Sequence, residues 1–282
     1  MILDIVPLTS TDEALLFLKR YEESSQFLIN NLREYGPKVG EYPYSGNFKI
    51  IKEKNQVVGV FCLAKCGNLY AQANHANYTE FILESCKREP FPVKGFLGPW
   101  DILSPLFECY KIENPSFKPS FQSKEILYRL PLEPKDIRFS HHQEVRLLVR
   151  NDFSDWLPLR TAYMKELGLT SDMAPDQVKI RFEKSTQNKI WWGLFRGGEL
   201  CSIAGLNSKG ENIGQVGGVF TPKPKRQLGL SKATMLHMLK DCRDLHGHTK
   251  SILFTGETDI PAQNLYESIG YDRIGHFALI LS

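Results

Sequence analysis

The sequence lacks several features that would place a protein in a special class. None of its apolar stretches reaches the roughly 18 residues that a transmembrane helix needs. Its first ten residues contain Asp4 and no basic residue, which argues against a secretion signal. Low-complexity segments and short repeats are also missing. With 42% hydrophobic and 24% charged residues, the chain has the composition of a globular protein, and we expect a cytoplasmic one.

An excess of charge and closely spaced cysteine pairs are missing as well. The 35 Lys and Arg against 32 Asp and Glu give a net charge of +3, which is too balanced to indicate a nucleic-acid or membrane partner. The six cysteines form no C-x-x-C pair, so we expect reduced thiols rather than disulfides or a zinc site. His141-His142 and His246-Gly-His248 resemble metal ligands only superficially, and we predict no metal site.

The length of 282 residues favours two domains, because single cores rarely grow beyond about 250–300 residues. The two prolines in the stretch 131–136 prevent a continuous helix or central strand there, so we place domains at 1–134 and 135–282. The second half predicts the order β-α-α-β-β-β-α-β-α-β, and the first half can be read as a fainter copy. The predicted fold class is α+β: two tandem domains, each a mixed, mostly antiparallel sheet flanked by helices.

One stretch of the second half has the features of an anion site. A strand ends near Thr221, a basic loop runs to Arg226, and a long helix begins around Gly229. A helix N-terminus presents unpaired N–H groups and the positive end of the helix dipole. Glycine allows a phosphate to approach this backbone closely, and Lys223, Lys225 and Arg226 add positive charge.

These residues resemble the GNAT superfamily of acyl-CoA-dependent N-acyltransferases. The segment Arg226-Gln-Leu-Gly229-Leu-Ser231 is similar to the family pattern Arg/Gln-x-x-Gly-x-Gly/Ala, with Ser231 in place of the last small residue. The segment from Asp259 to Tyr271 is similar to Asn-x-x-Ala-x-x-Leu-Tyr-x-x-x-Gly-Phe, with Asp259 replacing Asn and Tyr271 replacing Phe. The two motifs occur in the family order and on the expected elements.

The resemblance implies an N-acetyltransferase that moves an acetyl group from acetyl-CoA to a primary amine by direct attack in a ternary complex. The pyrophosphate would lie against Arg226, Gln227, Leu228, Gly229, Leu230 and Ser231. The backbone of Val219, Phe220 and Thr221 would pair with the pantetheine arm, and one N–H there would polarise the thioester carbonyl. Tyr266 would protonate the leaving thiolate, and Asn264 would be a neighbour of CoA. Gly217-Gly218, an adjacent pair inside the strand, predicts a bulge or splayed pairing.

Other parts of the reading stay open. Glu199 and Glu257 are alternative general bases, a water relay is a third possibility, and Gln215 cannot serve. The acceptor is a small-molecule or peptide amine, and the protein is a monomer with an internal pseudo-dimer or a homodimer. Alternatives are a non-catalytic CoA-binding sensor or scaffold and an acyltransferase for longer acyl chains. The first half has no phosphate motif, so we expect a degenerate copy that has lost its cofactor site.

Overall fold

A computed structural model describes residues 3–7, 11–133, 144–168 and 174–282 of the chain. The chain forms two compact units. Unit 1 comprises Met1–Tyr128, Phe254–Asp259 and Arg273–Ser282, and unit 2 comprises Arg129–Leu253 and Ile260–Asp272. The residues 134–143, where we predict the domain boundary, lie outside the described part of the chain.

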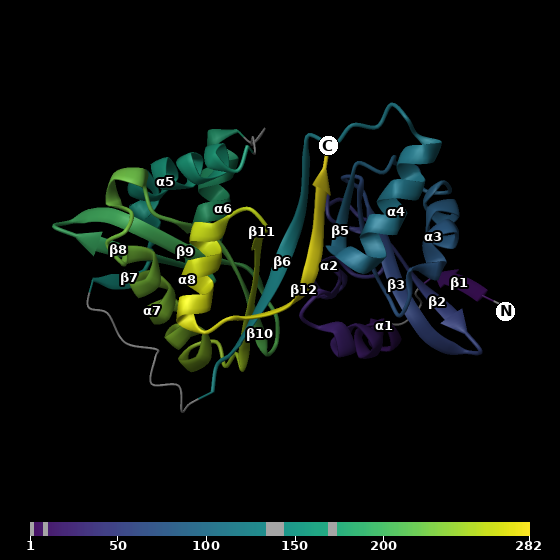
Figure 1. Ribbon diagram of the computed structural model, residues 1–282, viewed down its shortest axis with the longest axis horizontal. Helices are drawn as coiled ribbons and strands as arrows, with labels where there is room; N and C mark the ends of the chain where they lie inside the picture. Colours follow the sequence, from purple (N-terminus) through teal and green to yellow (C-terminus); the bar gives the residue numbers. More distant parts are fainter. Residues whose placement is uncertain (1–2, 8–10, 134–143, 169–173) are drawn as a thin grey trace. The chain divides into compact units, whose positions relative to one another are not determined.

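Unit 1 is built from helices and strands in alternating groups (Figure 1). In chain order its elements are β1 (Leu3–Pro7), α1 (Thr11–Leu18), α2 (Gln26–Tyr35), β2 (Gly46–Glu53), β3 (Gln56–Ala64), β4 (Asn68–Ala73), α3 (Thr79–Cys86), β5 (Gly95–Pro99), α4 (Trp100–Glu113), β6 (Phe121–Pro131), whose last three residues belong to unit 2, and β12 (Asp272–Leu281), which begins at the last residue of unit 2.

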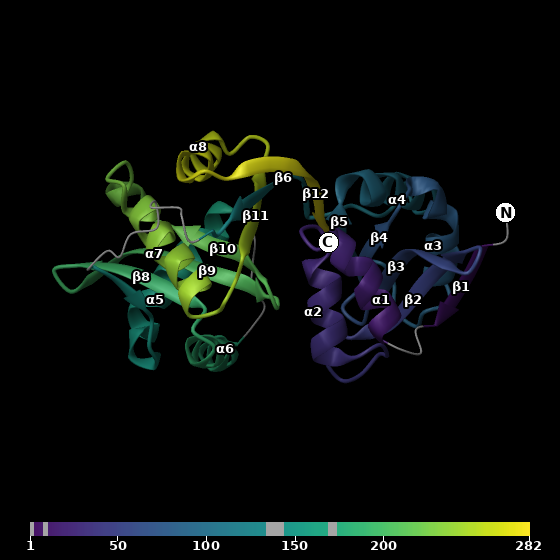
Figure 2. The same ribbon diagram turned by 90° about the horizontal axis from the view of Figure 1, so that it is seen from below.

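The sheet of unit 1 carries helices on both faces (Figure 2). Its strands follow the order β1-β2-β3-β4-β5-β12-β6. One core cluster joins Phe96 to residues of α3 and α4, including Leu83 and Leu106. A second cluster, on the other face, joins Phe48 and Val60 to residues of α1 and α2. Because adjacent strand residues point to opposite faces, each strand contributes to both cores.

The last strand of the chain belongs to the sheet of unit 1. Residues Phe277–Leu281 of β12 pair antiparallel with Gly95–Pro99 of β5. Ala278 and Ile280 are fully buried in the core beside α3 and α4. The compact units are therefore not the contiguous halves that a cut after residue 134 describes, because this distant pairing joins the C-terminus to the first half of the sequence.

Unit 2 repeats the same order of elements. They are β7 (Val145–Leu147), α5 (Phe153–Glu166), α6 (Pro175–Gln187), β8 (Trp191–Arg196), β9 (Glu199–Lys209), β10 (Ile213–Phe220), α7 (Leu230–Asp244), β11 (Lys250–Gly256), which passes into unit 1 after Leu253, and α8 (Ile260–Ile269). The strands of this unit follow the order β11-β10-β9-β8-β7.

The two adjacent tryptophans of β8 show how helices cover both faces of the unit 2 sheet (Figure 2). The Trp191 ring lies 5.4 Å from the Trp156 ring of α5. The Trp192 indole points to the other face, where its Nε1 donates a hydrogen bond to Asp241 of α7 at 2.8 Å. Among the described strand pairs, β10 and β11 are parallel in this sheet, and β4 and β5 are parallel in unit 1. Each unit is thus a mixed, mostly antiparallel sheet flanked by helices, which confirms the predicted fold class.

Candidate functional site

The centre of strand β10 contains the predicted bulge. Gly217 pairs with Gly205 of β9, but the next pair is Phe220 with Ile203, so β10 holds one residue more than β9 across this interval. Gly218 has φ +66°, a left-handed conformation that side-chain-bearing residues rarely adopt. A bulge leaves part of the ladder unpaired and turns the local backbone outward.

The space above the bulge is taken by side chains from other strands. A Cβ atom on Gly217 would lie 2.1 Å from Asn207 Nδ2, and one on Gly218 would lie 2.4 Å from Trp191 Cη2. Both distances are far below normal contact, and at Gly218 the left-handed backbone angle favours glycine as well. The indole of Trp191 therefore rests directly on the bulge.

On its other side, β10 loses its partner at the same level. Parallel pairing with β11 involves only Ile213, Gly214 and Gln215 of β10. Residues 216–220 continue without a β11 partner among the described pairs. The segment 219–221, which we predict to receive a pantetheine arm, thus begins after the pairing of β10 with β11 has ended.

The chain after β10 forms a loop that presents backbone N–H groups. A short 3₁₀ turn covers Lys223–Lys225, and α7 starts at Leu230. Gln227 and Gly229 both have positive φ, +63° and +73°. Within the described chain, the N–H groups of residues 227–232 donate to no backbone carbonyl and to no side chain. Consecutive N–H groups around left-handed residues at a helix start form a concave anion site.

Several predicted site residues contact one another at this loop. The hydroxyls of Thr221 and Ser231 lie 2.7 Å apart and link the end of β10 to the first turn of α7. Arg226 Nε donates to the carbonyl oxygen of Thr221 at 2.9 Å. The Arg226 guanidinium also lies 5.7 Å from the centre of the Phe220 ring. Ser231, the departure from the family pattern, therefore has a structural task that Gly or Ala could not perform.

Two of the three cations of the loop are already paired with carboxylates. Arg226 Nη2 lies 2.6 Å from Glu166 Oε2 of α5, and Lys225 Nζ lies 2.5 Å from Glu199 Oε1 of the β8–β9 hairpin. The Lys225 pair raises the pKa of that amine, and Glu199 is the main cause. Exposed Lys223 has no ion pair within the described residues. The loop is less positive than its sequence suggests.

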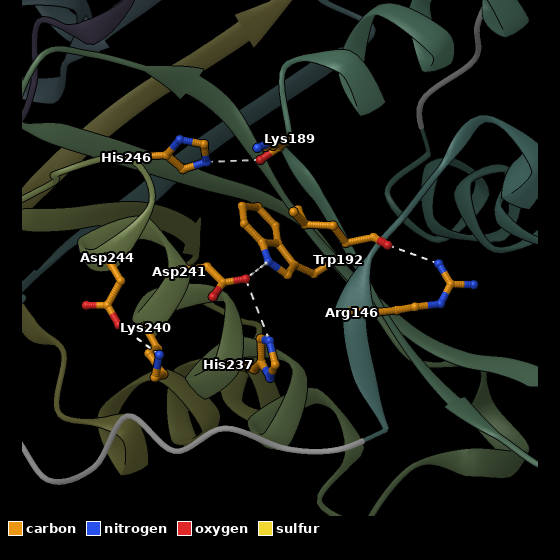
Figure 3. A network of polar contacts seen from close by, with 9 residues as sticks. Arg146, Lys189, Trp192, His237, Lys240, Asp241, Asp244 and His246 are labelled. Atoms are coloured by element: carbon orange, nitrogen blue, oxygen red, sulfur yellow. Dashed lines mark hydrogen bonds and ion pairs between the residues drawn. The ribbon is translucent and has the colours of Figure 1, made fainter.

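Helix α7 is held against β8 by a partly buried polar network (Figure 3). Asp241 Oδ2 accepts the Trp192 indole N–H at 2.8 Å and lies 3.6 Å from His237 Nε2. His246, just beyond the helix, lies 3.0 Å through Nε2 from the carbonyl oxygen of Lys189. A buried hydrogen bond to a carboxylate is worth about 1.5–3 kcal/mol. These contacts fix the axis of α7 and hence the direction of the N–H groups at its start.

The two predicted residues of α8 differ in burial. The side chain of Tyr266 is buried, with 9% of its surface exposed, and its ring lies 6.1 Å from that of Tyr271 in an edge-on arrangement. Asn264 is exposed on the opposite side of the helix. Lys232 Nζ donates to the carbonyl oxygen of Ser268 at 3.1 Å and so joins α7 to α8. Tyr266 is placed for a role in a packed interior, while Asn264 faces solvent.

The two candidate bases are both engaged in ion pairs. Glu199 is paired with Lys225, and 70% of its side-chain surface is exposed. Glu257 belongs to unit 1, where it pairs with Lys124 at 3.1 Å and with His276 at 3.3 Å. Gln215 is buried, and its Nε2 has no hydrogen-bond partner in the described chain. The role of the general base stays a prediction for either residue.

Other features of the described residues lie apart from this loop. A cavity of about 680 Å³ is in unit 1, at the C-terminal ends of α3 and α4, and its lining includes Leu83, Phe91 and Tyr110. It is thus not the counterpart of a helix N-terminus. No described helix combines the length and hydropathy of a membrane span. All six cysteines are free, and burial raises the pKa of the Cys86 thiol to about 12.

Sequence reasoning missed two residues of α5 that reach the site, Glu166 and Arg160. Glu166 binds Arg226 from 60 residues away, a pairing that no local pattern reveals. The guanidinium of Arg160 lies 5.9 Å from the Trp191 ring and 5.1 Å from the Tyr163 ring. Trp156, Arg160 and Tyr163 have the spacing i, i+4, i+7, which places all three on one helix face. That spacing was a signal that Arg160 points inward.

Comparison with known proteins agrees with this geometry. The acetyltransferase (GNAT) family model matches residues 154–271. No curated protein sequence gives a significant match. Among solved structures, a Drosophila protein aligns with a TM-score of 0.68 and 13% identity, covering 99% of this chain and 98% of that one.

Two further structures are titled as members of the same family. A GCN5-related N-acetyltransferase from Sphaerobacter thermophilus aligns with a TM-score of 0.62 and 11% identity, covering 99% of this chain and 95% of that one. A tandem GNAT protein from the clavulanic acid biosynthesis pathway aligns with a TM-score of 0.51 and 10% identity, covering 100% and 98%. Residues 154–271 are therefore similar to the acetyltransferase (GNAT) family, and the chain as a whole has the fold of tandem GNAT proteins.

Proposed function

We propose that unit 2 is an N-acetyltransferase that moves the acetyl group of acetyl-CoA to a primary amine of a small molecule or peptide. The observation that carries this proposal is the run of unpaired N–H groups at residues 227–232, directly after a strand with a glycine bulge. Six donors in one concave loop at a helix start suit the two phosphates of a pyrophosphate. The family match supports the same ligand.

The residues of the loop would divide the work of binding CoA. The backbone N–H groups of Gln227, Leu228, Gly229, Leu230 and Ser231 would donate to phosphate oxygens, and Lys223 would add charge. Gly229 suits a close approach because a Cβ atom there would meet nothing within 4 Å and its φ is left-handed. Val219, Phe220 and Thr221 would hydrogen-bond the pantetheine arm through their backbone, since β11 has already left this side of β10.

The acyl donor supplies a thioester, which an amine attacks once it has lost its proton. An N–H of the segment 219–221 would stabilise the negative charge that develops on the carbonyl oxygen. Tyr266 would donate the proton that the departing thiolate needs. Asn264 would lie at the edge of the bound CoA. The amine would reach the thioester by direct attack, so both substrates must be bound together.

Calorimetry and thiol release together test this proposal. Acetyl-CoA should bind the wild-type protein, and the double variant Arg226→Glu with Gly229→Val should abolish binding. The variant Arg150→Gln is a matched control, since Arg150 forms an exposed pair with Glu183 away from the loop. Release of free CoA with a panel of amines should then show turnover. Tight binding by the double variant would remove the loop from CoA recognition.

A second candidate function is a CoA-binding sensor or scaffold without catalysis. It is favoured by the ion pairs that occupy both candidate bases, Glu199 and Glu257. The same calorimetric result, combined with no thiol release from any amine, would identify it. A preference for a longer acyl chain would appear instead as faster turnover with that acyl-CoA than with acetyl-CoA.

A further inference from the structure

Arg160 differs from five other arginines of unit 2, each of which forms an ion pair with a carboxylate. These pairs are Arg146 with Asp152, Arg150 with Glu183, Arg196 with Glu144, Arg226 with Glu166, and Arg243 with Asp244. Arg160 has no ion pair or hydrogen bond within the described residues. It is partly buried, and burial lowers the pKa of its guanidinium. A guanidinium withdrawn from water without a counterion is unfavourable.

Aromatic rings surround this guanidinium. Its central carbon lies 5.1 Å from the Tyr163 ring and 5.9 Å from the Trp191 ring. Trp156, one turn earlier on α5, packs against Trp191 and completes an apolar wall. Cation–π contacts recover less free energy than a charge loses when it is withdrawn from water. The rings hold the planar group in place and leave its N–H donors without an acceptor in the part of the chain that the structure describes.

The position of Arg160 relates it to the reacting groups of the proposed reaction. A Cβ atom on Gly218 would lie 3.5 Å from Arg160 Nη1, so the guanidinium is beside the β10 bulge. The bulge directly precedes the segment 219–221, where the thioester would lie under the proposed function. A group held by Arg160 would therefore sit next to the acyl carbon, on the face of the sheet that α5 covers.

From these contacts we propose that Arg160 binds the carboxylate of the acceptor, and that the acceptor is a carboxylate-bearing amine of the amino acid class. This inference rests on the proposed function. The guanidinium fork matches a carboxylate with two parallel hydrogen bonds. The carboxylate would supply the missing counterion and fix the acceptor amine beside the acyl group. Trp191 and Tyr163 would pack against the rest of the acceptor.

Steady-state kinetics with matched amines test the assignment. The probes are glycine with methylamine, phenylalanine with phenethylamine, and lysine with cadaverine, each pair differing only in the carboxylate. We expect the wild-type protein to favour the amino acids, and Arg160→Gln to raise their KM by roughly 10- to 100-fold, as loss of a charged hydrogen bond implies. The KM of the plain amines and the affinity for acetyl-CoA should not change. Arg160→Lys should restore part of the preference, and Arg150→Gln should leave it intact.

Several outcomes would overturn the assignment. One is an amino acid KM that Arg160→Gln leaves unchanged. Another is a change in the ratio of activity with succinyl-CoA to activity with butyryl-CoA, while the preference among the amines stays the same. That result would mean that Arg160 binds the acyl chain. If Arg160→Gln does not fold, Arg160→Lys provides the test instead. The quantity compared is then the ratio of the amino acid KM to the KM of the matched plain amine.

A failure of the proposed function gives a different result. If no amine releases thiol, saturation-transfer NMR with phenylalanine and phenethylamine in the presence of CoA still tests Arg160. Selective binding of phenylalanine that Arg160→Gln removes would support the carboxylate site even without catalysis. Equal binding of the two amines would contradict it.

Discussion

The Arg226 guanidinium, which the sequence assigns to phosphate binding, is hydrogen-bonded to Glu166 across a distance of 2.6 Å. Its Nε is used as well, because it donates to the carbonyl oxygen of Thr221. The side chain thus joins the loop to strand β10 and helix α5. A phosphate would compete with the Glu166 carboxylate for the same donors.

The first prediction concerns this competition. Glu166→Gln should strengthen CoA binding by roughly threefold, because a partly exposed ion pair is worth about 0–1 kcal/mol. Isothermal calorimetry at low and moderate salt measures the change. Glu183→Gln, which removes the partner of Arg150, is the control and should leave the affinity as it is. An unchanged Kd in Glu166→Gln would mean that Arg226 acts on the loop alone and that the backbone N–H groups carry phosphate recognition.

The second prediction separates chemistry from binding at α8. Tyr266→Phe should lower kcat by about 100-fold, the contribution of a typical general acid, with little effect on acetyl-CoA affinity. Tyr271→Phe is a matched control, since its hydroxyl lies 2.7 Å from that of Ser251 in the interior. Loss of this hydrogen bond should cost about 1 kcal/mol of unfolding free energy and leave kcat within a few-fold of wild type. Full turnover in Tyr266→Phe would exclude Tyr266 as the acid.

The third prediction concerns the bulge. Gly218→Ala forces a side chain into a left-handed conformation and against the Trp191 ring, which its Cβ atom would meet at 2.4 Å. The unfolding free energy should fall by about 1–3 kcal/mol. Gly198→Ala has the same sign of φ but meets nothing within 4 Å, so its loss should be smaller. Urea unfolding measures the loss for each variant: Gly198→Ala has backbone strain alone, and Gly218→Ala has the strain and the overlap with Trp191. Equal losses of unfolding free energy would show that Trp191 moves aside freely.

The fourth prediction uses the buried His248 ring. Burial is the main cause that lowers the pKa of this imidazole to about 4, and the nearby His246 acts in the same direction. In the unfolded chain the pKa returns to about 6.5, so between these values the unfolded state binds more protons. Stability should therefore be complete above pH 6.5 and fall on the order of 2 kcal/mol as the pH drops toward 4.

Urea midpoints at several pH values check this effect. His248→Gln should flatten the decline between pH 6.5 and pH 4. His276→Gln should not, because 42% of the His276 side-chain surface is exposed and it pairs with Glu257. If stability declines equally steeply with falling pH in wild type and in His248→Gln, other groups cause the loss of stability in acid. Asp152, whose pKa is lowered, is one such group.

Local features of the fold could be predicted from the sequence, and distant pairings could not. The glycine pair at 217 and 218 predicts a bulge because two residues without Cβ atoms rarely serve a plain strand, and the bulge is present. The sequence also predicts that a long helix begins around Gly229, and α7 begins at Leu230 with Gly229 as its N-cap. In both cases the information lies in neighbouring residues.

Other features depend on residues that meet only after folding. Glu166 neutralises Arg226 from another helix, and nothing near either residue indicates this. The chain end was predicted as a strand, but its partner, β5, is almost 200 residues earlier, as the pair Phe277 and Pro99 shows. Side-chain burial of Arg160 had a local signal in its helical spacing, but a charged residue on an apolar face is easily read as solvent-exposed.

The pairing of β12 with β5 also determines when unit 1 can be finished during synthesis. A ribosome has to translate the codons of residues 277–281 before these residues can pair with residues 95–99. Until then the nascent chain carries an open sheet edge, the kind of surface that chaperones cover and that aggregates readily. A chain that stops before residue 277 would therefore leave the part of unit 1 that was made first without this strand.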